Sequence, residues 1–175
     1  ANYDIGFGAM SRVLASDTPI KVIVLNSGVY SNTGGQASTS SFTGQDSDLS
    51  RFGAASDGKH EGRKELGLLA SFHPHVYVCS TSTAFQGHFL KGTLEMLNYT
   101  SGPAVMDVYT PCGSEHGIPE AASNARARLA VESRMNPLFV HDPRRGDSLH
   151  DWFTVEGNPD PDKDWTTTTL QYRDD

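Results

Sequence analysis

The sequence is short of cysteines, of basic residues and of long apolar runs, and each shortage excludes a class of protein. Only two cysteines occur among 175 residues, so a framework of disulfides is not expected. No apolar run approaches the roughly 20 residues of a membrane-spanning helix, and the first residues lack the pattern of a signal peptide. The net charge of −7 disfavours nucleic-acid binding, which needs clustered lysine and arginine. These shortages predict a soluble, cytoplasmic protein without a membrane or nucleic-acid partner.

The residues that are present suit one α/β core. Hydrophobic residues make up 37% of the chain, and their spacing predicts helices over residues 4–15, 65–71, 84–99 and 120–133. Apolar runs predict strands over residues 21–25, 75–80, 104–109 and 138–141. Ser82 or Thr83 is expected to cap the third helix. Because strands alternate with helices, we expect a three-layer domain with a mostly parallel sheet built from right-handed crossovers.

The two ends of the chain differ from this core. Residues 1–143 are expected to form the α/β domain, and residues 144–175 a polar, turn-rich C-terminal extension. The chain does not begin with methionine, and its first residues already have helical spacing. We therefore expect it to be a piece of a longer polypeptide.

The most informative segment is residues 22–36, where an apolar β-branched run breaks into a loop of small polar residues. A continuously apolar strand is typical of a parallel sheet, and such sheets bind ligands at the carboxyl ends of their strands. Asn26 and Ser27 supply amide and hydroxyl oxygens there, and Gly28 lets a ligand approach the backbone. On these residues alone, a phosphate site and a glycine-rich turn without a ligand are both open. The long polar stretch over residues 31–64 favours a functional loop.

Three segments resemble those of one family. They are Asp-Ile-Gly-Phe-Gly from Asp4, Val-Tyr-Ser-Asn-Thr-Gly-Gly-Gln from Val29, and Tyr-Thr-Pro-Cys from Tyr109. In order and spacing they resemble the thiamine-diphosphate domain of the pyruvate:ferredoxin (flavodoxin) oxidoreductases. The resemblance implies the thiamine-diphosphate-binding fold without its first strand. It also implies that the chain lacks the Gly-Asp-Gly that precedes the segment matching Ala1 in the family, whose aspartate binds magnesium.

The resemblance further implies roles for the loop that follows the first strand. Ser27 would give its hydroxyl, and Val29 its backbone carbonyl, to Mg²⁺. Asn32 would contact the diphosphate or lie near the reacting carbon, which makes it the implied catalytic residue. The other implied cofactor-binding residues are Gly28, Tyr30, Ser31 and Thr33. The loop departs from the family at two positions, because Asn26 replaces the usual aspartate and Gly28 the usual glutamate.

Cys112 is the implied ligand of a [4Fe–4S] cluster. Such clusters normally take four cysteine ligands, so the other three would come from outside this chain. On the residues alone, a free thiol at the start of a loop is the alternative. Zinc binding by Cys112 with His116 lacks further ligands at the spacing of zinc sites. Cys79 lies in an apolar strand and is predicted to be a buried core thiol.

The implied activity is the oxidative decarboxylation of a 2-oxoacid, expected to be pyruvate, to acyl-coenzyme A and CO₂. The cofactors would be thiamine diphosphate, Mg²⁺ and a shared [4Fe–4S] cluster, with coenzyme A as co-substrate and ferredoxin or flavodoxin as electron acceptor. Other domains or subunits of the enzyme, a homodimer as a whole, would complete the site, so the chain alone should bind the cofactor weakly or not at all. Two alternatives stay open: a non-oxidative thiamine-diphosphate decarboxylase or synthase, and a non-catalytic interface module of the same fold.

Overall fold

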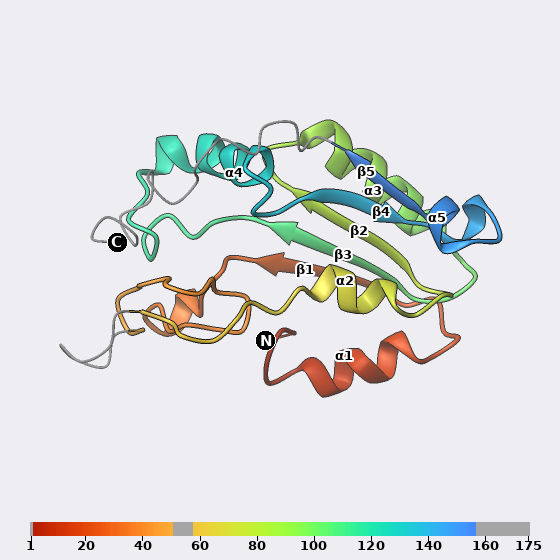
Figure 1. The fold of residues 1–175 in the computed structure, drawn as a ribbon, viewed down its shortest axis with the longest axis horizontal. Coiled ribbons are helices and arrows are strands. Elements are labelled where there is room, and N and C mark those ends of the chain that lie inside the picture. The colour runs from red at the N-terminus through yellow and green to blue at the C-terminus, as the bar shows by residue number, and fades with distance from the viewer. Residues whose placement is uncertain (1, 51–57, 157–175) are drawn as a thin grey trace.

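The chain folds around one mixed sheet (Figure 1). The computed structural model describes residues 2–50 and 58–156. The strands are β1 (Lys21–Asn26), β2 (Tyr77–Ser82), β3 (Ala104–Tyr109), β4 (Leu138–His141) and β5 (Phe153–Glu156), in the order β1–β3–β2–β4–β5. β1, β3 and β2 are parallel, whereas β4 is antiparallel to β2, and β5 is antiparallel to β4. The predicted α/β fold with a mostly parallel sheet is confirmed.

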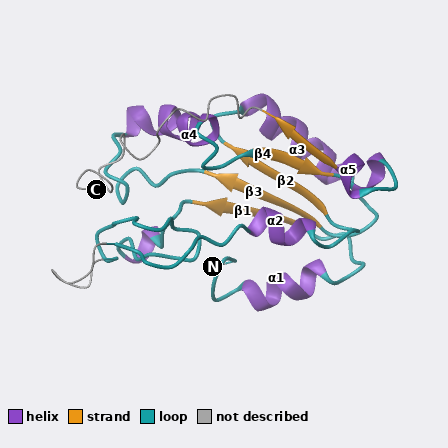
Figure 2. Cartoon of the chain, in the orientation of Figure 1, coloured by secondary structure: helices purple, strands orange, loops and turns teal. Residues whose placement is uncertain are grey.

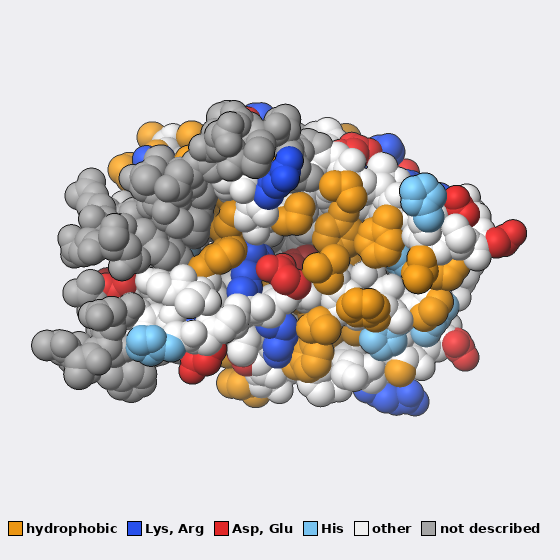
Figure 3. Space-filling model, in the orientation of Figure 1, with side chains coloured by type: hydrophobic (Ala, Val, Ile, Leu, Met, Phe, Trp, Pro, Cys, Tyr) orange, Lys and Arg blue, Asp and Glu red, His pale blue; other side chains and the backbone are white. Residues whose placement is uncertain are grey.

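Helices cover both faces of the sheet, as the three-layer prediction requires (Figure 2). On one face, α1 (Phe7–Leu14) and α2 (Leu66–Ser71) pack against apolar side chains of the strands. Hydrophobic side chains gather on the surface over α2 and the neighbouring strands (Figure 3). On the other face lies α3 (Gln86–Asn98), whereas α4 (Ser123–Glu132) and α5 (Leu149–Trp152) lie at opposite ends of the sheet. Short 3₁₀ turns occur at Ser31–Thr33, Glu120–Ala122 and Pro143–Arg145. Within the described ranges, no helix combines the length and the apolar character that crossing a bilayer demands.

The third helix, α3, leaves much of its apolar surface exposed. Its buried residues are Gly92 and Met96, which face the sheet. A Cβ at Gly92 would lie 2.5 Å from the Sγ of Cys79, so a glycine there allows the helix to approach β2 closely. Three leucines of this helix are exposed: Leu90, Leu94 and Leu97.

The predicted cap of this helix is wrong. The N-cap residue is Phe85, and no side chain hydrogen-bonds there. β2 extends to Ser82, two residues beyond the predicted end of the strand, so the hydroxyl residues belong to the strand end and the turn. Ser82 Oγ instead accepts a hydrogen bond from the backbone N–H of Ala84 at 3.3 Å.

The fourth strand runs against the direction that simple alternation predicts. α4 lies beyond the carboxyl ends of the parallel strands instead of crossing a face of the sheet, so the chain enters β4 from that end (Figure 1). Asn136 Nδ2 donates to the carbonyl of Thr81 at 3.3 Å, and Ser80 Oγ donates to the carbonyl of Pro137 at 3.0 Å. These two bonds fix the entry, and β4 therefore pairs antiparallel with β2.

The last described strand was not predicted from the sequence. β5 is four residues long and follows α5, which begins with a capping box between Ser148 and Asp151. It extends the sheet beyond β4, and Phe153 packs on His141 with ring centroids 5.0 Å apart. The predicted boundary between a domain over residues 1–143 and an extension over residues 144–175 stays a prediction.

Candidate cofactor site

The site begins where β1 ends. We name residues 27–36 the glycine loop. Ser27 donates its hydroxyl to the carbonyl of Val29, with 3.0 Å between the two oxygens. Gly28 between them has φ +77°, a left-handed conformation that favours glycine. The loop closes on itself because Tyr30 N–H donates to Gln36 and Gly35 N–H donates to Tyr30, each at 2.9 Å.

The separation of the two oxygens in this loop suits a magnesium ion. Mg²⁺ prefers six oxygen ligands in an octahedron at about 2.1 Å, in which neighbouring oxygens lie about 3.0 Å apart. The hydroxyl of Ser27 and the carbonyl of Val29 already have that separation. The residues present therefore fit two neighbouring positions of a magnesium shell, although the prediction that they bind the ion stays a prediction.

The carbonyl of Gly28 accepts hydrogen bonds from two side chains of the long connection between β1 and α2. Gln45 Nε2 donates to it at 3.1 Å, and Ser41 Oγ donates to it as well. The side-chain oxygen of Gln45 accepts from Phe42 N–H at 3.2 Å, so both ends of this buried amide are used. Position 28 is thus fixed by side-chain bonds that no local pattern in the glycine loop predicts.

A second set of bonds runs from the loop into the sheet. Gly28 N–H donates to Asn26 Oδ1 at 3.1 Å, and Asn26 Nδ2 donates to the Tyr3 hydroxyl at 2.8 Å. Tyr3 in turn donates to Asp107 Oδ2 at 2.5 Å. An aspartate at position 26 could not donate to Tyr3, so asparagine suits this chain. The amide of Asn26 is used at both ends within the protein.

Asp107 is the acidic end of this set, and the sequence analysis missed it. Its carboxyl is completely buried in β3, and burial raises its pKa to about 6. Oδ2 accepts from Tyr3, whereas Oδ1 has no hydrogen-bond partner among the described residues. A lone acidic residue within the apolar run over residues 104–109 was the signal that could have found it.

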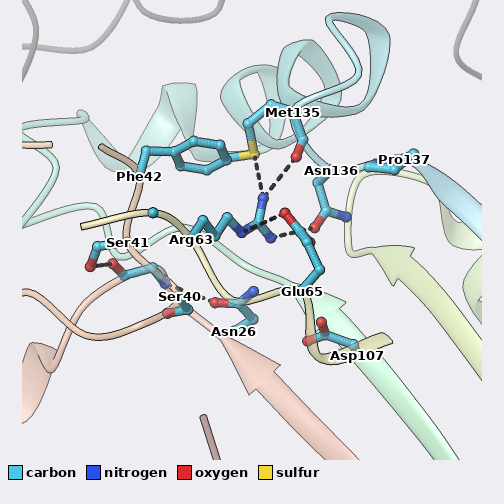
Figure 4. A network of polar contacts seen from close by, with 12 residues as sticks. Asn26, Ser40, Ser41, Phe42, Arg63, Glu65, Asp107, Met135, Asn136 and Pro137 are labelled. Carbon is cyan, nitrogen blue, oxygen red and sulfur yellow. Dashed lines mark hydrogen bonds and ion pairs between the residues drawn. The ribbon is translucent and has the colours of Figure 1, made fainter. Parts of the chain in front are cut away.

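Arg63 anchors the far end of the long connection (Figure 4). Its guanidinium donates to the carbonyl of Met135 at 2.8 Å, lies 3.4 Å from the Glu65 carboxylate and stacks 4.6 Å from the ring centre of Phe42. The Arg63 side chain is 6% exposed, whereas the Glu65 side chain is 44% exposed, so the buried charge is paired with a carboxylate that still reaches water. This anchor ties the connection to the turn that leads into β4.

Two cavities bear on where a ligand could sit. One of about 120 Å³ adjoins Ser27 and Tyr30 beside the N-terminal segment. Pockets that hold a whole cofactor usually measure about 300–1,000 Å³, so the described residues form only part of such a site. A larger cavity of about 580 Å³, lined by Phe85, His88 and Arg128 among others, lies apart from the glycine loop and contains none of the predicted site residues.

The remaining predicted cofactor residues lie on the outer side of the glycine loop. Tyr30 donates its hydroxyl to Asp4 at 2.6 Å, and burial with this bond raises the pKa of Tyr30 to about 12. Ser31, Asn32 and Thr33 form a 3₁₀ turn in which Asn32 and Thr33 are exposed. Thr33 Oγ1 lies 2.6 Å from the side-chain oxygen of Gln36, so its hydroxyl is already engaged. Asn32 is exposed at the rim of the loop, and its contact with a ligand stays a prediction.

Cys112 lies in a second loop beside the first one. We name residues 110–118 the cysteine loop. Cys112 is partly exposed, and its Sγ lies 3.4 Å from the hydroxyl oxygen of Ser114. In the same loop His116 is buried, and its Nε2 lies 2.7 Å from the carbonyl oxygen of Ser27. The sequence indicated His116 only as a candidate zinc ligand. This contact leaves no local pattern, because the side chain bonds a distant backbone group.

The second cysteine has the environment that the sequence predicts. Cys79 is buried in β2, and burial raises the pKa of its thiol to about 12. The described residues contain no group of three or more His, Cys, Asp or Glu side chains that could hold a metal ion. Cys112 therefore fits a cluster only as one ligand, with the others supplied from outside the described residues.

Comparisons with known proteins agree with the motifs. No protein-family model matches the chain. A pyruvate:ferredoxin oxidoreductase of Moorella thermoacetica is 37% identical over 173 residues, which are 98% of this chain and 14% of that protein. A probable pyruvate-flavodoxin oxidoreductase of Escherichia coli is 36% identical over 83% of this chain and 12% of its own length. The chain thus spans about one seventh or less of these relatives.

A solved structure has a similar fold. It is the 2-oxoglutarate:ferredoxin oxidoreductase from Magnetococcus marinus with 2-oxoglutarate, coenzyme A and succinyl-CoA bound. It aligns with a TM-score of 0.53 and 18% identity over 65% of this chain and 37% of that chain, a likeness that concerns the fold alone. By sequence, the chain is homologous to one segment of the pyruvate:ferredoxin and pyruvate-flavodoxin oxidoreductases, which confirms the resemblance of its three motifs to that family.

Proposed function

We propose that the chain is part of a 2-oxoacid oxidoreductase and carries half of its thiamine-diphosphate site. The whole protein would convert a 2-oxoacid, pyruvate first among them, and coenzyme A to acyl-coenzyme A and CO₂. Ferredoxin or flavodoxin would accept the two electrons one at a time. The proposal rests mainly on the 37% identity with the Moorella protein over 98% of this chain. The spacing of two oxygens in the glycine loop, which is that of neighbouring magnesium ligands, supports it.

The glycine loop would bind and orient the cofactor. Ser27 Oγ and the Val29 carbonyl would hold Mg²⁺, and Asn32 at the rim would contact the diphosphate or the substrate. Gly28, Tyr30, Ser31 and Thr33 would line the diphosphate. When bound, thiamine diphosphate supplies the carbon nucleophile and the electron sink that decarboxylation of a 2-oxoacid requires. The chain's own contribution is a preformed loop, since the bonds to the Gly28 carbonyl already hold its backbone.

Cys112 would bind one iron of a [4Fe–4S] cluster whose other ligands lie elsewhere in the whole protein. Its partial exposure at the edge of the cysteine loop leaves the sulfur open to such a neighbour. The proposal therefore includes other domains or subunits, a homodimeric whole enzyme and a cytoplasmic location. The length of the relatives supports further domains, because this chain accounts for 14% of the Moorella protein.

Cofactor binding is tested by calorimetry on the full-length protein with thiamine diphosphate and MgCl₂. Ser27→Ala removes one proposed magnesium ligand and should raise the Kd at least tenfold, which corresponds to about 1.4 kcal/mol. Ser16→Ala is the matched control, since that hydroxyl only bonds the Val13 carbonyl at the end of α1, close to the amino end of the sheet. Equal affinities of Ser27→Ala and the unmodified protein would contradict the proposed magnesium site.

The cluster is tested by measuring iron per chain and visible absorption in the full-length protein. Cys112→Ser should lose iron and the charge-transfer absorption of the cluster, because one of four thiolate ligands is removed. Cys79→Ala is the control, since its thiol is buried in the core and cannot reach a cluster outside the chain. Equal iron contents in Cys112→Ser and Cys79→Ala would rule out ligation by Cys112.

The activity is tested by following the reduction of ferredoxin and of flavodoxin by the full-length protein. Reduction should require pyruvate, or another 2-oxoacid, together with coenzyme A. Decarboxylation without electron transfer would instead favour the non-oxidative alternative.

A further inference from the structure

The cysteine loop and the glycine loop are joined at their starts by the sheet. β1 and β3 are neighbours, and their ladder continues one residue beyond β3, because Thr110 N–H donates to the carbonyl of Asn26, the last residue of β1, at 2.9 Å. The two loops therefore leave the carboxyl end of the sheet side by side. Neither loop can shift at its base without disturbing the other.

His116 joins the two loops a second time, farther from the sheet. Its side chain is 1% exposed, and Nε2 lies 2.7 Å from the carbonyl oxygen of Ser27. A carbonyl can only accept a hydrogen bond, so Nε2 must carry the proton and donate it. A Cβ at Gly28 would lie 3.3 Å from the imidazole ring, so glycine lets the ring approach the loop backbone. The carbonyl that His116 holds belongs to the residue whose hydroxyl is the proposed magnesium ligand.

Glu115 makes a third contact. A Cβ at Gly35 would lie 2.1 Å from the carboxylate of Glu115, so the side chain lies directly against the glycine loop at its far end. Gly35 has φ +79°, which a side chain would also strain. Neighbouring residues of one loop thus touch both ends of the other loop.

Backbone hydrogen bonds make the cysteine loop a tight turn, so a shift of Cys112 also shifts His116. His116 N–H donates to the carbonyl of Cys112 at 3.2 Å, Ile118 N–H to Gly113 at 2.7 Å, and Gly117 N–H to Ser114 at 3.1 Å. These bonds fix the backbone of Cys112 relative to the imidazole of His116. A restraint on the Cys112 sulfur is therefore also a restraint on the Ser27 carbonyl.

We propose that His116 is a positioning residue that couples the two loops, so that a cluster held by Cys112 and a cofactor held at Ser27 strengthen each other's binding. The inference rests on the proposed function. Coupling between two sites is reciprocal, so a cluster that tightens cofactor binding is itself retained better when the cofactor is bound. Typical couplings change affinity roughly 5- to 150-fold.

The experiment is a double-mutant cycle on the full-length protein. Calorimetry with thiamine diphosphate and MgCl₂ gives the Kd of the unmodified protein, Cys112→Ser, His116→Phe and the double variant, with iron per chain measured in each. Each single change should raise the Kd roughly fivefold or more, and the double change should raise it no further than the larger single effect. His116→Gln keeps a donor near the position of Nε2 and should restore most of the affinity.

Several outcomes would overturn the coupling. One is a Kd in Cys112→Ser equal to that of the unmodified protein, a comparison that does not depend on whether His116→Phe folds. Another is a Kd of the double variant that has risen by the product of the two single fold-changes. A histidine with a merely structural role would have the same effect on the Kd with and without the cluster. If the unmodified protein binds cofactor and iron, and the variants give either of these results, only the coupling fails. If it binds neither, the proposed function fails, and the coupling fails with it.

Discussion

The sheet and the connection between β1 and α2 are stabilised by opposite kinds of side chain. The strands bury mainly apolar residues, which pack against helices on both faces. The described part of the connection buries polar ones: Ser38, Ser40, Ser41, Gln45, Ser47, Ser50 and Lys59. The sheet is thus specified by which side chains leave water, whereas the connection is specified by which hydrogen bonds its side chains complete.

This contrast is visible in the bonds of the connection. Ser38 N–H donates to Ser41 Oγ at 2.9 Å, Ser47 N–H donates to Ser50 Oγ at 2.6 Å, and Lys59 Nζ donates to the Ser41 carbonyl at 2.7 Å. Each such bond contributes only about 1 kcal/mol net, but a partner left buried and unbonded costs more. The two regions should therefore respond differently to mutation, the sheet through cooperative unfolding and the connection through local opening.

The largest effect is expected in the sheet. Met106 is fully buried in β3, under Gly92 of α3. Met106→Ala removes buried side-chain atoms from a packed core and should lower the free energy of unfolding by about 2–5 kcal/mol. Urea denaturation of the 175-residue chain measures it. Leu149→Ala, at a residue that is largely exposed, is the control and should change stability by less than about 0.5 kcal/mol.

The next effect tests Asp107, a buried acidic residue of β3. The pKa of Asp107 is about 6 in the folded chain and close to 3.8 when unfolded, so the folded state binds the proton more tightly. Stability should therefore fall as the pH rises from about 4 to about 6, by on the order of 3 kcal/mol, and stay low above that. Asp107→Asn lacks this titration. A stability difference between the two proteins that does not change between pH 4 and pH 7 would contradict the prediction.

A smaller effect is expected in the connection. Gln45→Leu removes a donor to the Gly28 carbonyl and an acceptor for Phe42 N–H, and should ease local opening of the glycine loop by about 1–3 kcal/mol. Hydrogen exchange should show faster exchange at Gly28 and Phe42, with protection in β3 unchanged. Equal losses of protection in both regions would mean that the sheet and the connection unfold as one cooperative unit.

The smallest effect is expected on the α1 face of the sheet. Gly8 in α1 has nothing within 4 Å of where a Cβ would lie, and its backbone is helical. Gly8→Ala should stabilise the chain by about 0.5 kcal/mol, because alanine loses less backbone entropy on folding. Gly35→Ala is the contrasting change in the glycine loop and should destabilise, since φ is positive and Glu115 occupies the space. Thermal melting compares the two.

Much of the sheet could be predicted because burial leaves a local pattern. The apolar runs over residues 104–109 and 138–141 became β3 and β4 with the predicted ends. The direction of β4 could not be predicted, because it depends on α4 lying beyond the end of the sheet. β5 could not be predicted either, since Phe153–Glu156 is short and lies in a region rich in polar turn residues.

The candidate site was predicted only in its local part. The glycines and hydroxyls after β1 indicated a ligand loop, and the motif resemblance supplied the roles of Ser27 and Val29. The contacts that hold the loop join Gly28 to Gln45, and Ser27 to His116, across long stretches of sequence. A side chain that bonds a distant backbone carbonyl leaves no periodicity to detect, so these residues emerged only from the fold.

The close approach of Gly92 to Cys79 makes the labelling rate of Cys79 a measure of how often α3 opens. The thiolate is the form of cysteine that attacks a thiol reagent. Cys79 is buried, and burial raises the pKa of its thiol, so Cys79 can react only after α3 moves away from the sheet. Cys112 is partly exposed and should be modified first. Once Cys112 is blocked, the slow labelling of Cys79 reports how often the helix opens, without any added probe. The rate of cofactor binding can then be compared with the rate at which α3 opens.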